Sequence, residues 1–357
     1  MPDLADRFSN AVTALCEKYD WPGVTAAAQT RGGRLQATAG LSSRVNAEPM
    51  RTSDRLLPAS IGKMITSAVA VLLAEAGRIE LDAPIASAMS HHDWWTQIPH
   101  GPLITLRHLL QHRAGIRDYQ SASGFAELIE SIGADGDAWL TPEQAILLAC
   151  SDGPLYVPGA LTVYSDSGYL LAGLVIEAVT GERYYDLART LVLTPAGMAT
   201  TEPNDQPVLA GLVQGYTDPA GPFGYMEHVL GDDGALLYNP RTEWTGGGFI
   251  SNADDLVSLA IFMFDGGLGA NCVGQLLTTY AIYDRTPLGQ YGMGVMITPT
   301  SYGPSIGHTG SIPGYRSLAA YSPVSRSAIS FMINSDAPDW DMLHDARETL
   351  GAIAAGA

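Results

Sequence analysis

Apolar and polar residues form two kinds of pattern along the chain. Strand-like segments occupy residues 23–40 near the start and residues 291–299, 305–310, 315–323 and 327–334 near the end. The first segment divides into two expected strands around a turn at Arg31-Gly32-Gly33. Strands near both ends of the chain predict one α/β domain that is assembled from the two ends.

The middle of the chain shows the longer apolar period of helices. Helical patterns cover residues 104–112, 124–132, 141–150, 168–181 and 184–193. They predict a mainly helical domain at 82–245, inserted into an α/β domain that consists of 1–81 and 246–357. The active site is expected between these two domains. Further helices are expected at the N-terminus, after a capping box at residues 251–254, and at 340–355.

One helix is apolar on nearly every side. Residues 64–76, which follow the stretch Ala59-Ser60-Ile61-Gly62-Lys63, are almost wholly apolar or small, and Gly77 supplies a stop. This composition predicts a core helix that is buried on most sides. Lys63, at its N-terminal end, is therefore expected to point into the protein.

The chain uses lysine only at Lys18 and Lys63, although it has 19 basic residues. Arginine keeps its proton in proteins, whereas a buried lysine can release one. Ser60 and Lys63 share one face of a first helical turn, so the amine can reach the serine hydroxyl. The alternative is that Lys63 is a helix-surface charge, because a serine and a lysine at this spacing also occur by chance.

Composition narrows the function classes. The chain has 357 residues, 46% of them hydrophobic, and a net charge of −18. That charge argues against nucleic acid and anionic membranes as partners, and solubility explains it without any partner. Three widely spaced cysteines, Cys16, Cys150 and Cys272, fit neither a disulfide framework nor a zinc site and are expected to be buried apolar residues.

Two histidine-rich segments raise the question of a metal. His108 and His112 stand four residues apart, but Leu109 occupies the position at which the metalloprotease pattern needs Glu. The stretch "HHDWWTQIPH" at 91–100 has metal-ligating side chains without a recognisable pattern around them. Packing histidines explain both segments better, so neither a metal nor a cofactor is expected.

The N-terminus lacks the basic segment and apolar core of a signal peptide. We therefore expect a cytoplasmic protein, although a chain that had lost its leader would look the same.

Two further motifs could complete a serine site. Tyr164 precedes a polar loop that leads into an apolar helix, and a tyrosine there can act as a base when a nearby cation lowers its pKa. The segment "IGHTGSIPGYRS" places glycines and a threonine between small residues, which gives a backbone edge for a substrate.

These motifs carry a family resemblance. Ser60-Ile61-Gly62-Lys63, Tyr164-Ser165-Asp166 and His308-Thr309-Gly310 have the order and approximate spacing of the three signatures of the penicillin-recognising serine hydrolases. The chain resembles the branch with class C β-lactamases, DD-peptidases, D-amino-acid amidases and family VIII-type esterases, and connecting phrases such as "ITLRHLLQHRAGI" and "GGGFISNADDLVSL" extend the likeness over nearly the whole chain. It implies a β-lactamase/DD-peptidase-like α/β fold, with helices around an antiparallel sheet and an inserted helical domain.

The resemblance also implies roles. Ser60 resembles the nucleophile that forms an acyl-enzyme, Lys63 its proton partner, and Tyr164 the base. The backbone N–H groups of Ser60 and Ser311 would form the oxyanion hole. Thr309 and Gly310 would line the strand that binds the substrate.

Two positions depart from the pattern. Asp166 stands where most relatives have Asn, and an ionised carboxylate cannot donate a hydrogen bond to a substrate carbonyl. It would also hold Lys63 protonated, which shifts the base role toward Tyr164. His308 stands where β-lactamases usually have Lys, so its charge depends on pH. Arg316 is a candidate for the missing charge, in a direction that the sequence leaves open.

The expected function is a metal-independent serine hydrolase that cleaves small amides or peptides, with D-amino-acid residues as the first choice. A carboxylesterase on the same scaffold is the close rival. A weak β-lactamase, or a penicillin-binding sensor that acylates without turnover, is the third possibility. The partner is a small amide, peptide or ester, and the oligomeric state is left open.

Overall fold

A nine-stranded sheet connects the two ends of the chain in the part that the computed structural model describes, which is residues 3–132, 139–220, 226–281, 289–336 and 341–356. Its strands, in spatial order, are β3 (Glu48–Pro49), β2 (Gly33–Ser43), β1 (Gly23–Thr30), β11 (Ser327–Ile333), β10 (Tyr315–Ser322), β9 (Gly303–Ile312), β8 (Met296–Thr300), β7 (Gln290–Tyr291) and β6 (Tyr280–Ala281). Each neighbouring pair is antiparallel, as the family resemblance implies.

The first and last parts of the chain meet in the centre of this sheet. β1 pairs with β11, so that Val24 lies opposite Ile333, and it pairs with β2 across the predicted turn. Gly33 ends that turn with a φ of 125°, a value that residues other than glycine rarely adopt. The expected strand at 291–299 is divided into β7 and β8.

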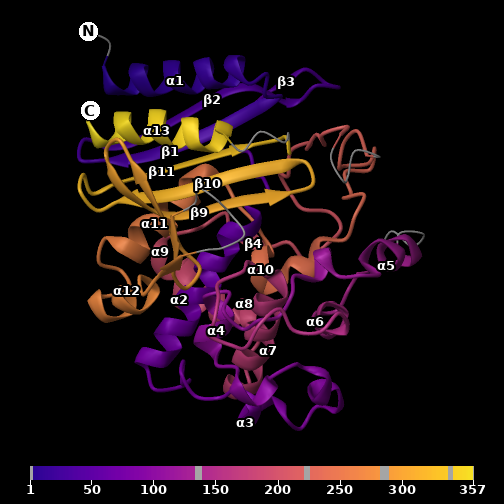
Figure 1. Ribbon diagram of the computed structural model, residues 1–357. Coiled ribbons are helices and arrows are strands. Elements are labelled where there is room, and N and C mark those ends of the chain that lie inside the picture. Colours follow the sequence, from indigo (N-terminus) through magenta and orange to yellow (C-terminus); the bar gives the residue numbers. More distant parts are fainter. Residues whose placement is uncertain (1–2, 133–138, 221–225, 282–288, 337–340, 357) are drawn as a thin grey trace.

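Alternate residues of the central strands face two different cores. On β10, Leu318 and Ala320 pack with the helices α1 (Leu4–Lys18) and α13 (Asp341–Ala355), which lie above the sheet in Figure 1. Ala319 and Tyr321 face the opposite core, beneath the sheet. This period of two is the geometry of a strand that is buried on both faces.

The opposite face of the sheet is covered by helices that lead to the rest of the chain. α11 (Ala253–Phe264) contacts β1, β10 and β11, and α2 (Gly62–Glu75) lies below the sheet (Figure 1). The other helices are α3 (Ala86–Met89), α4 (Leu106–Leu110), α5 (Phe125–Ile132), α6 (Pro142–Ser151), α7 (Asp166–Thr180), α8 (Tyr184–Ala188), α9 (Thr194–Ala196), α10 (Trp244–Gly247) and α12 (Ala270–Leu276). A small two-stranded sheet joins β4 (Glu202–Pro203) to β5 (Phe249–Ile250).

Helix boundaries follow local chemistry. Thr141 and Gln144 form a reciprocal capping box at the start of α6. Gly77 follows α2 with a φ of 67°, which confirms the predicted stop. The cap of α11 differs from the expectation, because Asn252 accepts the N–H of Asp255 in place of a box that begins at Ser251.

One apolar core crosses the expected domain boundary. Met64 of α2 and Met332 of β11 belong to the same buried cluster as Leu170 of α7. The division into two domains therefore stays a prediction. No helix among the described residues is both long enough and apolar enough to cross a membrane.

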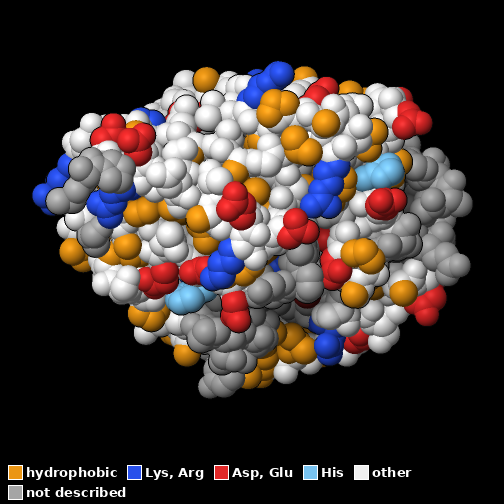
Figure 2. Space-filling view, turned by 90° about the horizontal axis from the view of Figure 1, so that it is seen from above, with side chains coloured by type: hydrophobic (Ala, Val, Ile, Leu, Met, Phe, Trp, Pro, Cys, Tyr) orange, Lys and Arg blue, Asp and Glu red, His pale blue; other side chains and the backbone are white. Residues whose placement is uncertain are grey.

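Charged side chains are mixed on the face that Figure 2 shows. Lys and Arg side chains are interspersed there with acidic ones. Such a mixed surface agrees with the interpretation of the net charge as a source of solubility.

Candidate active site

Ser60 lies in a tight turn that leads into α2. The turn Ala59–Ile61 is a short 3-10 helix, and Ala59 has a φ of 49°, in the left-handed region that costs energy for alanine. A side chain at Gly62 would come within 2.8 Å of the Cα of Gly247, so glycine allows α10 to approach this turn closely. Ser60 itself stays half-buried and therefore accessible.

Lys63 is fully buried one turn farther along. Its ammonium donates to the Oγ of Ser60 at 2.9 Å and to the carbonyl of Gly246 at 2.7 Å, and it forms an ion pair with Asp166. The side chain thus points into the protein, as the apolar helix predicts.

The charge of Lys63 results from two opposing effects. Burial disfavours the charged form and by itself lowers the pKa of Lys63. The negative charge of Asp166 and the hydroxyl of Tyr164 outweigh burial and raise that pKa well above its ordinary value. The lysine is therefore a stable cation in this environment.

Tyr164 approaches Ser60 from the other side. Its hydroxyl donates to the Oγ of Ser60 at 2.8 Å, and its ring centre lies 5.0 Å from the ammonium of Lys63. The ring of His112 packs against it with centroids 4.1 Å apart, while the Nδ1 of His112 accepts the N–H of Ser165. His112 thus positions Tyr164 in two ways, by packing against its ring and by a hydrogen bond to the backbone of the next residue.

The third motif lies on β9, beside the turn that carries Ser60. An added side chain at Gly310 would come within 2.0 Å of the carbonyl oxygen of Pro58, so only glycine permits this approach. Ser317, opposite Gly310 on β10, donates to the same carbonyl at 2.7 Å. β8 pairs with β9 only as far as Gly307, and Ser311, which is exposed, lies beyond that pairing.

His308 is buried, with an exposed fraction of 1%. Its Nε2 lies 2.9 Å from the hydroxyl of Tyr291, and its Nδ1 contacts the carbonyl of Thr309. A carbonyl can only accept, so Nδ1 carries a hydrogen and the Nε2 of a neutral ring accepts from Tyr291. Both ring nitrogens thus have partners within the protein.

Arg316 lies on the other face of the sheet from His308. It pairs with Ser311, whereas His308 pairs with Ala319. Its Nη2 donates to the carbonyl of Asp336 at 2.9 Å. The role of Arg316 as a charge for the substrate stays a prediction, and this placement does not favour it.

Two carboxyl groups near the site were not identified from the sequence. Asp118 accepts the N–H of Asp166 at 2.8 Å and that of Gln120 at 2.9 Å. If Gly247 carried a Cβ, that atom would lie 3.0 Å from the Oε2 of Glu243, so the Glu243 carboxylate lies close to Gly247. Burial, followed by the charge of Asp166, raises the pKa of Asp118 to about 6 and that of Glu243 to about 8. The nearest sequence signal is the position of Glu243 just before "WTGGG".

The other histidines considered for a metal have structural contacts. The Nδ1 of His108 accepts the N–H of Thr105 in the capping box of α4. The rings of His91 and His92 lie tilted against each other with centroids 4.1 Å apart, and His92 stacks on Trp94.

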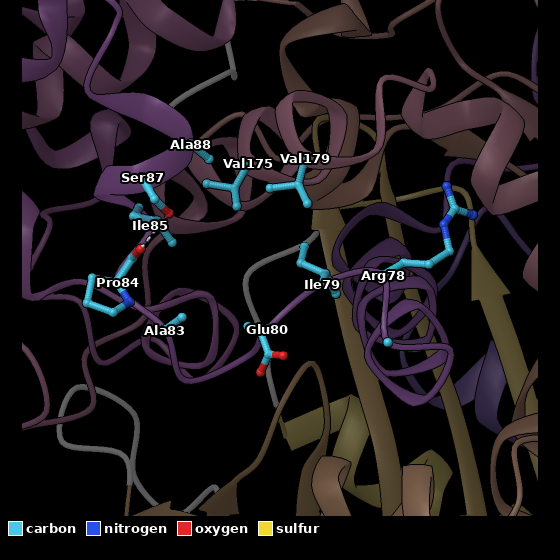
Figure 3. Close-up of a pocket in the computed structure, with 11 residues that line it drawn as sticks. Arg78, Ile79, Glu80, Ala83, Pro84, Ile85, Ser87, Ala88, Val175 and Val179 are labelled. Atoms are coloured by element: carbon cyan, nitrogen blue, oxygen red, sulfur yellow. Dashed lines mark hydrogen bonds between the residues drawn. The ribbon is translucent and has the colours of Figure 1, made fainter.

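A separate surface pocket lies at the opposite end of α2 from Ser60. Its lining includes Arg78, Glu80 and Pro84, with Val175 and Val179 of α7 on the other side (Figure 3). The 14 residues of α2, a length of about 20 Å, separate this pocket from the Ser60 turn.

Comparisons with known proteins show which family and which solved structures the chain resembles. A D-aminopeptidase of Cereibacter sphaeroides is 25% identical over 98% of this chain, which spans only 63% of that relative. The solved structure of a D-stereospecific amidohydrolase from Streptomyces sp. is 28% identical, with a TM-score of 0.79 over 97% of this chain and 98% of the other. The D-amino acid amidase of Ochrobactrum anthropi SV3 has the same fold, with a TM-score of 0.82, 22% identity and 99% coverage of both chains. The profile of the family described as Beta-lactamase matches residues 8–353, and the chain therefore belongs to that family.

Proposed function

We propose that the protein is a serine hydrolase that cleaves amides or short peptides of D-amino acids through an acyl-enzyme. The observation that carries this proposal is the position of the Ser60 hydroxyl, within 3 Å of both the Lys63 ammonium and the Tyr164 hydroxyl. A nucleophile with a cation and a proton carrier at hydrogen-bond distance is the arrangement that covalent catalysis requires. The similarity to a D-aminopeptidase and a D-stereospecific amidohydrolase supports the substrate class.

The proton in this mechanism moves through Tyr164. Lys63 stays charged because of Asp166, so it stabilises the phenolate of Tyr164 and orients Ser60. The phenolate takes the Ser60 proton as Oγ attacks the substrate carbonyl carbon. It then returns this proton to the departing amine as the C–N bond breaks.

Deacylation repeats these steps with water. Tyr164 takes a proton from water, whose oxygen attacks the acyl carbon, and returns it to Ser60 as the ester bond breaks. The N–H groups of Ser60 and Ser311 stabilise the oxyanion in both steps. This role for Ser311 is supported by the contact of β9 with the turn Ala59–Ile61.

The site belongs to both parts of the chain in this proposal. Ser60 and Lys63 come from the segment 1–81, and Tyr164 and Asp166 come from the helical segment 82–245. A substrate would lie between them, along the edge of β9 that includes Thr309 and Gly310.

The test is a substrate panel with D- and L-amino-acid amides, p-nitrophenyl esters and a chromogenic cephalosporin. Turnover of D-amides above the L-amides and esters would support the proposal, together with a mass increase of one acyl group on the peptide that contains Ser60. Turnover of esters alone would favour the carboxylesterase. A stable penicilloyl adduct without turnover of any substrate would indicate a penicillin-binding sensor.

A further inference from the structure

We propose that Glu243 selects substrates with a free amino group, by binding their ammonium beside Ser60. This inference rests on the proposed function, since it assigns a substrate group to the same site. Neither the three signature motifs nor the oxyanion hole involves Glu243, and its side chain comes from the turn that precedes α10.

The geometry places the Glu243 carboxylate next to the turn of the nucleophile. A Cβ at Gly247 would lie 3.0 Å from the Oε2 of Glu243 and 2.9 Å from the carbonyl oxygen of Ala59, the residue before Ser60. The carboxylate and the Ser60 turn therefore approach the same point from two sides.

The backbone after Glu243 is strained in a way that supports this placement. Trp244 has a φ of 29° and a ψ of −111°, a conformation that a bulky residue rarely adopts. Strain of this kind persists where the surrounding structure enforces it, and it is concentrated at functional sites. Here it turns the chain from Glu243 into α10, whose Gly246 accepts the hydrogen bond of Lys63.

No hydrogen bond or ion pair engages the carboxylate of Glu243 among the described residues, although this residue is half-buried. Asp166, in contrast, is paired with Lys63, and Asp118 accepts two backbone N–H groups. The Glu243 carboxylate is therefore the one of these three that remains available to a substrate ammonium.

The charge balance of the site favours a cation as its ligand. Three carboxyl groups, those of Asp118, Asp166 and Glu243, influence one another around the single ammonium of Lys63. Burial and the charge of Asp166 raise the pKa of Glu243 to about 8, so the free site retains a proton near neutral pH. When a substrate ammonium binds, Glu243 releases this proton to solvent, and the ammonium neutralises the negative charge of its carboxylate. An N-acylated substrate carries no charge that could do so.

The first experiment compares two substrates on three proteins. The substrates are D-phenylalanine p-nitroanilide and its N-acetyl derivative, and the proteins are wild type, Glu243→Gln and Glu80→Gln. Glu80 is an exposed carboxylate beyond the far end of α2 and serves as the matched control (Figure 3).

We expect Glu243→Gln to lower kcat/KM for the free amine by about 10- to 100-fold, the range for a hydrogen bond to a charged group. The N-acetyl substrate should change by less than about threefold on the same scale. Glu80→Gln should match wild type with both. An unchanged preference in Glu243→Gln would overturn this inference while the hydrolase function stands. If wild type neither turns over any substrate of the panel nor forms an acyl adduct at Ser60, the proposed function fails, and this inference fails with it.

A second measurement keeps Glu243 intact. Calorimetric titration of Ser60→Ala with D-phenylalanine amide at pH 6, in two buffers with different ionisation enthalpies, reports the protons that binding releases. We expect the release of nearly one proton, because both the ligand amine and Glu243 carry protons at this pH. N-acetyl-D-phenylalanine amide should release none. Equal release with the two ligands would overturn the role of Glu243.

Discussion

Lys63 and Asp166 form an ion pair in which the lysine side chain is fully buried and the aspartate keeps 16% of its surface exposed. The carboxylate compensates for the burial of the ammonium, so Lys63 keeps its charge. In return, the charge of Asp166 is committed to Lys63 and is not free for a substrate. Because of this pair, we expect Tyr164 rather than Lys63 to transfer protons, and Glu243 rather than Asp166 to bind a substrate ammonium.

Replacement of Ser60 should abolish turnover. Ser60→Ala is expected to lower kcat by about 10⁶-fold, because the nucleophile acts as a unit with its proton carriers. The fold should remain intact by circular dichroism. Mass spectrometry with a slow substrate should show one acyl group on the peptide that contains Ser60. Ser87→Ala, an exposed serine, is the control, and an adduct at another residue would contradict the mechanism.

Lys63 should not tolerate arginine. Lys63→Arg retains a charge, but the larger guanidinium has to occupy a fully buried position and reach Ser60, Gly246 and Asp166 with a different geometry. We expect kcat to fall by about 10³-fold, close to the effect of Lys63→Ala. Steady-state kinetics of the two variants provides the measurement. High activity of Lys63→Arg would show that only the charge matters.

Asp166 and His308 together should influence the substrate class. Asp166→Asn supplies an amide that can donate to an acylamide carbonyl, and His308→Lys supplies a permanent cation for a carboxylate. The wild type should prefer D-amino-acid amides over a cephalosporin by about 10- to 100-fold in kcat/KM. The double variant should narrow this ratio. An unchanged ratio, or a wild type that prefers the cephalosporin, would show that these positions do not set the class.

Glu243 should make stability depend on pH. Its pKa of about 8 in the folded protein exceeds the ordinary value for glutamate, so the folded state holds a proton that the unfolded chain has lost. The free energy of unfolding of wild type should therefore fall as pH rises from about 5 to 8. Glu243→Gln removes this loss. The difference in the free energy of unfolding between wild type and Glu243→Gln should therefore change by about 1–3 kcal/mol over this pH range. Urea unfolding at both pH values measures it, with Glu80→Gln expected to follow wild type.

The contact of Gly310 with Pro58 should be essential. Gly310→Ala places a methyl group 2.0 Å from a carbonyl oxygen and must move β9 away from the Ser60 turn. We expect a loss of about 100-fold in kcat and about 1–3 kcal/mol in the free energy of unfolding. Gly274→Ala in α12, with nothing within 4 Å of the added methyl group, is the control and should be neutral or slightly stabilising. Equal behaviour of the two variants would contradict the close approach.

Some features of the protein could be predicted because they depend on neighbours in the chain. The pairing of Ser60 with Lys63 follows from one helical turn, and the strands and helices follow from apolar periods over about ten residues. The stop at Gly77 follows from a conformation that glycine adopts readily. The sequence by itself therefore determined the fold class and the first half of the site.

Contacts between distant segments were decided only by the tertiary structure. Periodicity shows which face of a strand or helix is buried but not which side chain will lie opposite it. The sequence left the direction of Arg316 open, and the register of β10 places it on the other face of the sheet from His308. Glu243 had no sequence pattern of its own, and only the approach of Gly247 to Ala59 placed its carboxylate beside the nucleophile. The approach of Gly247 to Ala59 spans more than 100 residues of chain, where no local rule of spacing applies, and the face of Arg316 follows from a strand register that one residue of slip would reverse.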